Sequence, residues 1–166
     1  MIKLLVLDVD GCLTDGKIIY SSDASEVKEF NVKDGLAIAS WIKLGNHVAI
    51  ITGRNSFVVK KRADELGIQH LYQGIKNKLD VLNTIMSELN LQAYEVAAIG
   101  DDLNDYEMLS LAGRSFTPKD GVRDIQEIVD TVLSKKGGDA AVREMIDTII
   151  EENDQKDAFL SLWIEE

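Results

Sequence analysis

Short apolar runs alternate with amphipathic segments along the chain. The apolar runs end in polar residues or glycine, as strands buried on both faces of a parallel sheet do. Four such runs predict strands at residues 2–9, 47–52, 70–72 and 95–100. Apolar residues at spacings of three and four predict helices at residues 56–66, 78–89 and 105–111. This alternation predicts an α/β fold with a doubly wound parallel sheet of the Rossmann type.

One stretch near the N-terminus departs from this rhythm. Residues 17–21 and 26–32 have the pattern of two strands joined by a polar turn, which predicts a β-hairpin insertion over about residues 16–34. A further amphipathic helix is predicted at residues 139–152. A chain of this length supplies apolar residues for about one core, so we expect residues 1–166 to form a single domain with no separate cap domain.

The composition narrows the classes of partner. The 166 residues include 29 acidic and 18 basic side chains, for a formal net charge of −11. No broad positive field is available for nucleic acid or an anionic membrane surface, so we expect neither as a partner. No apolar run is long enough to span a bilayer and no signal peptide is recognisable, so we expect a cytoplasmic location. The single cysteine, Cys12, fits a reducing compartment.

Polar side chains follow three of the predicted strands at the point where each ends. In open parallel sheets, ligands bind beyond the carboxyl ends of the strands. Asp8 and Asp10 follow the first strand, and their spacing of two directs both carboxylates to the same face. The other candidates are Thr52 after the second strand, Lys78 at the start of a helix, and Asp101, Asp102 and Asp105 at and after the end of a later strand.

So many carboxylates in one cleft are unfavourable unless some are protonated or a hard cation is bound, and Mg²⁺ is the simplest such cation. Mg²⁺ held by carboxylates indicates phosphoryl transfer. Asp8 is then the candidate nucleophile, and Asp10 can protonate the leaving oxygen and later deprotonate water. Lys78 and the Thr52 hydroxyl can neutralise charge on the phosphoryl oxygens. Cys12 is interpreted as a packing residue, because negative neighbours suppress the thiolate.

Four parts of the sequence together resemble the signature motifs of the haloacid dehalogenase superfamily of phosphohydrolases. They are DVDGCLTD at residues 8–15, ITGR at residues 51–54, Lys78, and GDDLND at residues 100–105. Within that superfamily the chain is similar, over nearly its whole length, to a small group without a lid domain. The group acts on a phosphorylated eight-carbon keto-sugar acid in the synthesis of bacterial lipopolysaccharide. The resemblance therefore implies a Mg²⁺-dependent phosphatase of this kind, with a phosphorylated sugar acid as substrate.

The resemblance also implies roles for individual residues. It implies Mg²⁺ ligands at Asp8, Asp101 and the backbone carbonyl of Asp10, with Asp102 and Asp105 beside them. It implies substrate contacts from a larger set, namely Asp10, Asn31, Lys33, Asp34, Gly35, Arg54, Arg62 and Lys78. It implies a homotetramer in which the hairpins of the copies join and a neighbouring copy helps to close the site.

Three alternatives stay open. The substrate could be a related nine-carbon keto-sugar acid phosphate, although the form of residues 52–54 favours the eight-carbon acid by resemblance. The chain could be a signalling receiver domain, which also gathers Asp, Thr, Lys and Mg²⁺, but there the lysine follows the threonine on a late strand, whereas Lys78 precedes Asp101 and opens a helix. Finally, it could be a non-catalytic oligomerisation module, although it keeps all the expected catalytic side chains.

Overall fold

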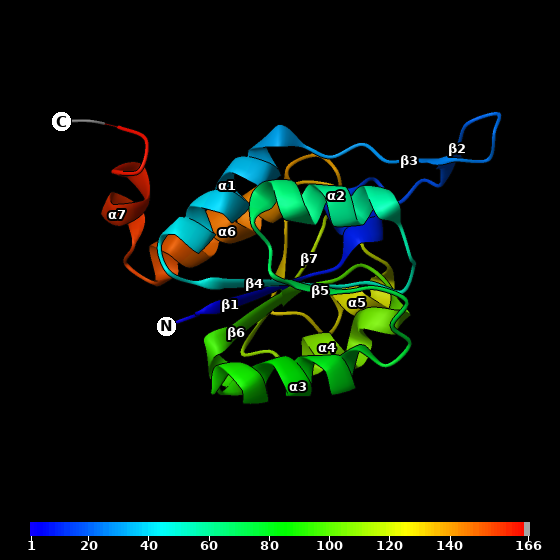
Figure 1. The fold of residues 1–166 in the computed structure, drawn as a ribbon. Coiled ribbons are helices and arrows are strands. Elements are labelled where there is room, and N and C mark those ends of the chain that lie inside the picture. The colour runs from blue at the N-terminus through cyan, green and yellow to red at the C-terminus, as the bar shows by residue number, and fades with distance from the viewer. Residues whose placement is uncertain (165–166) are drawn as a thin grey trace.

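A six-stranded parallel sheet with helices on both faces forms the body of the protein (Figure 1). The computed structural model describes residues 1–164. The strand order is β5-β4-β1-β6-β7-β8, and the strands are β1 (Leu4–Leu7), β4 (His47–Ile51), β5 (His70–Tyr72), β6 (Val96–Ile99), β7 (Arg114–Thr117) and β8 (Thr131–Val132). The predicted α/β fold with a doubly wound parallel sheet is confirmed.

Helices cover the sheet on both sides because successive residues of a buried strand point to opposite faces. In β1, Leu5 and Leu7 pack into the core beneath α1, α2 and α6, whereas Leu4 and Val6 pack against α3, α4 and α5 (Figure 1). All four leucine and valine side chains are fully buried. The helices are α1 (Val32–Lys43), α2 (Phe57–Leu66), α3 (Lys78–Leu89), α4 (Tyr106–Leu111), α5 (Arg123–Gln126), α6 (Ala141–Glu152) and α7 (Lys156–Leu160).

The predicted hairpin exists but is shorter than expected. It consists of β2 (Ile19–Tyr20) and β3 (Glu26–Val27), which pair antiparallel and extend away from the sheet (Figure 1). The expectation that the second strand continues to residue 32 was wrong, because Asn31 caps a helix there. Its side chain accepts a hydrogen bond from the backbone N–H of Lys33 at 2.9 Å, which starts α1 at Val32.

The pattern along the sequence predicted most of the other elements but not all of them. Helices α2, α3, α4 and α6 and strands β1, β4, β5 and β6 were expected, with ends that differ by at most two residues. Helices α1, α5 and α7 and strands β7 and β8, of which β8 is at an edge of the sheet, were not predicted. Within residues 1–164, no helix combines the length and the apolar composition that crossing a membrane requires.

Candidate active site

The strand order determines where a site can form. Strands β1 and β6 are neighbours in the sheet. The next strand of the sheet after β1 is β4, which lies toward one edge, whereas the next strand after β6 is β7, which lies toward the opposite edge. A crevice opens beyond the carboxyl ends of such strands. Asp8 directly follows β1, and its backbone N–H donates to the Ile99 carbonyl of β6 at 3.2 Å. Asp8 and Asp101 therefore enter the crevice from adjacent strands.

The turn after β1 brings Asp10 back toward the same crevice. Residues Val9–Leu13 form the tight turn η1, in which Gly11 has a φ of 95°. This left-handed conformation favours glycine. A Cβ at this position would also lie 1.9 Å from Oδ2 of Asp101, so the absence of a side chain is what allows the turn and Asp101 to approach.

Lys78, the first residue of α3, ties the two strand ends together. Its ammonium donates to Oδ1 of Asp8 at 2.8 Å and to Oδ1 of Asp105 at 2.5 Å, and its side chain is 1% exposed. The other oxygen of Asp105 accepts the backbone N–H groups of Asp101, at 2.9 Å, and Asp102, at 3.4 Å. Lys78 and Asp105 thus fix the positions of both Asp8 and the Asp101 loop.

Burial and mutual repulsion raise the pKa values of Asp8 and Asp101. Burial, followed by the charge of Asp105, raises the pKa of Asp8 to about 6. Burial, followed by the charge of Asp8, raises the pKa of Asp101 to about 8. Burial alone would lower the pKa of Lys78, but Asp8 and Asp105 raise it above the ordinary lysine value. One ammonium is therefore insufficient for this cluster, and a further cation is favourable here.

The donor atoms fit Mg²⁺ as that cation. Within residues 1–164, one oxygen each from Asp8 and Asp101 lie, together with the Cys12 sulfur, within 4.8 Å of one another. Carboxylate oxygens suit a hard divalent ion, and Mg²⁺ is commonly bound by one or two of them with waters and a phosphate. The Cys12 thiol is fully buried and its pKa is raised well above its usual value, first by burial, so it remains protonated and contributes packing rather than charge.

A cavity of about 250 Å³ opens beside this cluster. Its lining residues are Asp8, Asp10, Gly16, Thr52, Gly53, Arg54, Asp101, Asp102 and Asn104. Thr52 is buried at the end of β4, whereas the Arg54 side chain is 42% exposed at the rim. The structure thus brings together six residues singled out from the sequence for catalysis, metal binding or substrate contact, and Lys78 lies directly behind Asp8.

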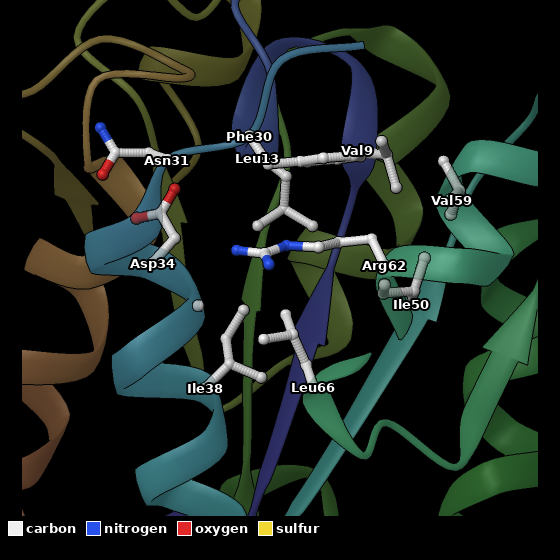
Figure 2. Close-up of a pocket in the computed structure, with 11 residues that line it drawn as sticks. Val9, Leu13, Phe30, Asn31, Asp34, Ile38, Ile50, Val59, Arg62 and Leu66 are labelled. Carbon is white, nitrogen blue, oxygen red and sulfur yellow. The ribbon is translucent and has the colours of Figure 1, made fainter. Parts of the chain in front are cut away.

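Other predicted substrate contacts lie elsewhere in this chain. Asn31, Asp34, Gly35 and Arg62 line a second, nearly filled pocket of about 10 Å³ between α1 and α2, where the Arg62 side chain points across toward α1 (Figure 2). A Cβ on Gly35 would lie 2.3 Å from Nη2 of Arg62, so glycine makes room for the guanidinium. Lys33 is exposed and lines, with Asn31, an open groove of about 580 Å³.

Asp34 is the most unusual member of this second group. It is 2% exposed, its Oδ1 accepts the backbone N–H of Arg143 at 2.8 Å, and its buried Oδ2 has no hydrogen-bond partner within residues 1–164. Burial raises its pKa to about 6. This group does not line the cavity beside Asp8.

Comparison with known proteins agrees with this geometry. A family model described as haloacid dehalogenase-like hydrolase matches residues 71–146. The chain is 39% identical over 163 residues to 3-deoxy-D-manno-octulosonate 8-phosphate phosphatase KdsC of Yersinia pestis, covering 98% of this chain and 87% of that protein. The corresponding Escherichia coli K12 protein is 40% identical over 149 residues, covering 90% and 79%. The chain belongs to the haloacid dehalogenase-like hydrolase family.

A solved structure of this family extends the likeness to three dimensions. The Moraxella catarrhalis 3-deoxy-D-manno-octulosonate 8-phosphate phosphatase, in complex with a magnesium ion, a phosphate ion and KDO, superposes with a TM-score of 0.94 at 40% identity. The match covers 98% of this chain and 94% of that one. The resemblance noted from the sequence motifs is confirmed, and the receiver-domain alternative is not supported.

Sequence reasoning missed two charged residues at the site of this hydrolase. Lys28 and Glu26 come from the end of the hairpin, and the Lys28 ammonium lies 2.5 Å from Oδ1 of Asp10. Glu26 in turn pairs with Arg54 at 2.9 Å. The only available signal was their polar character within the hairpin, which solvent exposure explains equally well.

Proposed function

We propose that the chain is a Mg²⁺-dependent phosphatase that hydrolyses 3-deoxy-D-manno-octulosonate 8-phosphate to the eight-carbon sugar acid, KDO, and phosphate, in the synthesis of lipopolysaccharide precursors. The observation that carries the reaction type is the buried cluster in which Lys78 joins Asp8 and Asp105 while Asp101 faces Asp8. The choice of substrate is supported by the phosphatases named above and by the presence of KDO and phosphate in the Moraxella catarrhalis structure.

In the first half-reaction, a carboxylate oxygen of Asp8 attacks phosphorus and the bond from phosphorus to the sugar oxygen breaks. Asp10 gives a proton to that oxygen, so the sugar acid leaves as an alcohol and the phosphoryl group stays on Asp8. Lys78 and Thr52 offer positive charge and a hydroxyl donor to the phosphoryl oxygens. Because Lys78 is already held by two carboxylates, it needs little reorganisation for this role.

In the second half-reaction, water attacks phosphorus and Asp10 accepts its proton. The bond from phosphorus to Asp8 then breaks, which releases phosphate and returns Asp8 to a carboxylate. A Mg²⁺ ion held by Asp8, Asp101 and the backbone carbonyl of Asp10 would supply the positive charge that lets these oxygens and a phosphate share one cavity. We propose that Asp102 and Asp105 support this arrangement from beside the ligands.

The rest of the substrate needs further cations, because a phosphorylated sugar acid is negative at both ends. Arg54 lies at the rim of the cavity and suits a carboxylate through its planar fork of donors. We propose that Asn31, Lys33, Asp34, Gly35 and Arg62 also contact the sugar acid. Since this group lines pockets separate from the cavity in one chain, we propose that it does so where copies of the chain meet.

We also propose a homotetramer assembled through the hairpin. Ile19, Tyr20 and Val27 are 37%, 61% and 42% exposed, and the two-residue strands have few contacts of their own to stabilise them. Pairing with another copy would bury these side chains and satisfy the strand edges. Light scattering after size-exclusion chromatography tests this, with a mass near four chains of 18.4 kDa expected and a monomer contradicting it.

A cytoplasmic location completes the proposal. The single cysteine, Cys12, is a buried free thiol, which a reducing compartment preserves. Fractionation of cells that produce the protein, with periplasmic and cytoplasmic marker enzymes as references, tests the location.

The decisive experiment measures phosphate release from a panel of phosphorylated keto-sugar acids and simple sugar phosphates, with and without EDTA. We expect metal-dependent turnover with preference for the eight-carbon acid. Preference for the nine-carbon acid would change the substrate and leave the reaction type intact. A chain that forms a tetramer yet hydrolyses none of the panel would instead be an assembly module.

A further inference from the structure

Lys28 occupies an unusual position for a lysine that follows an exposed hairpin strand. Its ammonium lies 2.5 Å from Oδ1 of Asp10 and 2.8 Å from Oε1 of Glu26, and its side chain is only 1% exposed. The other oxygen of Glu26 accepts a hydrogen bond from Nη2 of Arg54 at 2.9 Å. Two cations and two carboxylates thus alternate from the rim of the cavity to Asp10.

The burial of Lys28 distinguishes this contact from an ordinary surface ion pair. Exposed lysines gain little from such pairs, and their long side chains normally keep the ammonium in water. Lys17, in the same hairpin region, behaves in that way: it lies 3.4 Å from Asp15 and is 77% exposed. Removing an ammonium from water is unfavourable unless it is paired, so Lys28 and its two carboxylates hold one another in a defined arrangement.

This arrangement leaves the two oxygens of Asp10 in different situations. Oδ1 is held by Lys28, whereas Oδ2 has no hydrogen-bond partner within residues 1–164 and Asp10 lines the cavity beside Asp8. When one oxygen of a carboxylate is fixed, the carboxylate can adopt fewer orientations, so the position of its second oxygen is also restricted. Proton transfer requires that oxygen to be within hydrogen-bond reach of the reacting group.

We infer that Lys28 is a positioning residue that fixes the Asp10 carboxylate so that its free oxygen faces the leaving oxygen of the substrate. The inference rests on the proposed phosphatase function. Lys28 itself touches neither substrate nor phosphorus in this scheme; it acts through Asp10. Through Lys28, the hairpin therefore contributes to the orientation of the group that transfers the proton.

The leaving group of the substrate separates this role from a structural one. A nitrophenolate leaves without a proton, whereas the alkoxide of a sugar needs one as the bond to phosphorus breaks. Removing the positioning residue should therefore slow cleavage of a sugar phosphate more than that of p-nitrophenyl phosphate. The quantity to compare is kcat/KM, because it covers the steps up to departure of the leaving group and excludes the shared hydrolysis of phosphoryl-Asp8.

The test compares wild type and Lys28→Met on KDO 8-phosphate and p-nitrophenyl phosphate, with Lys17→Met as a matched control. We expect Lys28→Met to lower kcat/KM for the sugar phosphate by about tenfold or more and for the aryl phosphate by less than about threefold. In an Asp10→Asn background, Lys28→Met should have little further effect on either substrate. Lys17→Met should match wild type on both.

Equal losses on the two substrates, or a full additional loss in the Asp10→Asn background, would overturn the inference. If circular dichroism shows that Lys28→Met is unfolded, Glu26→Gln decides instead, since it loosens the second anchor of Lys28. It should show a smaller loss with the same preference for the sugar phosphate, and a uniform loss would refute the role. A wild-type chain that cleaves neither ester would refute the proposed function and this inference together.

Discussion

Asp101 should destabilise the metal-free protein at alkaline pH, and its replacement by Asn should relieve this. Its pKa is about 8 in the folded protein, against 3.8 for an ordinary aspartate, because of burial and the charge of Asp8. The folded state therefore binds this proton more tightly than the unfolded state. The unfavourable contribution of Asp101 to the stability of the folded protein is absent below about pH 4, grows as the pH rises, and is fully present above about pH 8.

The size of the effect follows from the shift. Each pKa unit corresponds to about 1.4 kcal/mol, so the rise from 3.8 to about 8 sets an upper bound of roughly 6 kcal/mol. Asp101 is only partly buried and solvent reaches the cavity that it lines, so we expect about 2 kcal/mol. In EDTA at pH 8, Asp101→Asn should thus be more stable than wild type by about 2 kcal/mol, and the difference should shrink toward zero at pH 4.

Urea unfolding followed by tryptophan fluorescence measures this difference, since Trp41 is fully buried. Asp64→Asn is the matched control, because Asp64 is 63% exposed in its pair with Lys60 and should change stability by less than about 0.5 kcal/mol at either pH. Mg²⁺ should stabilise wild type at pH 8 and leave Asp101→Asn unaffected. A difference between Asp101→Asn and wild type that does not depend on pH would refute the electrostatic reasoning.

Three further predictions concern the same cluster. Asp8→Asn should abolish phosphate release while leaving the circular dichroism spectrum unchanged, and measurable turnover would exclude Asp8 as the nucleophile. Lys78→Met should lower the free energy of unfolding by about 3–5 kcal/mol at pH 8 without metal, because two buried carboxylates lose their cation; a loss below about 1 kcal/mol in urea titration would contradict this. Gly11→Ala should impair Mg²⁺ binding measured by calorimetry, since its Cβ would collide with Asp101, and wild-type affinity would show that the turn adapts.

The sequence determined the type of fold and the central chemistry. Buried parallel strands such as β1 and β6 must be apolar along their whole length, so their runs stand out, and the polar residues that end them mark the edge where ligands bind. For this reason the order of residues along the chain is enough to place Asp8, Asp10, Thr52 and Asp101 together. Helix α1 was missed because only its first three residues fell within the predicted hairpin and the rest of it was assigned to no element, whereas Asn31 starts the helix through a local cap.

Only the tertiary structure decided how charges from distant segments meet. Lys78 lies 70 positions from Asp8 in sequence, and its distance to two carboxylates follows from the packing of α3 against the sheet. The polar character of Lys28 was not a specific signal, because a polar residue after a hairpin strand is equally compatible with solvent and with a buried ion pair. Periodicity records which face of an element is buried. The partner of a buried charge depends on long-range packing, which local sequence patterns do not encode.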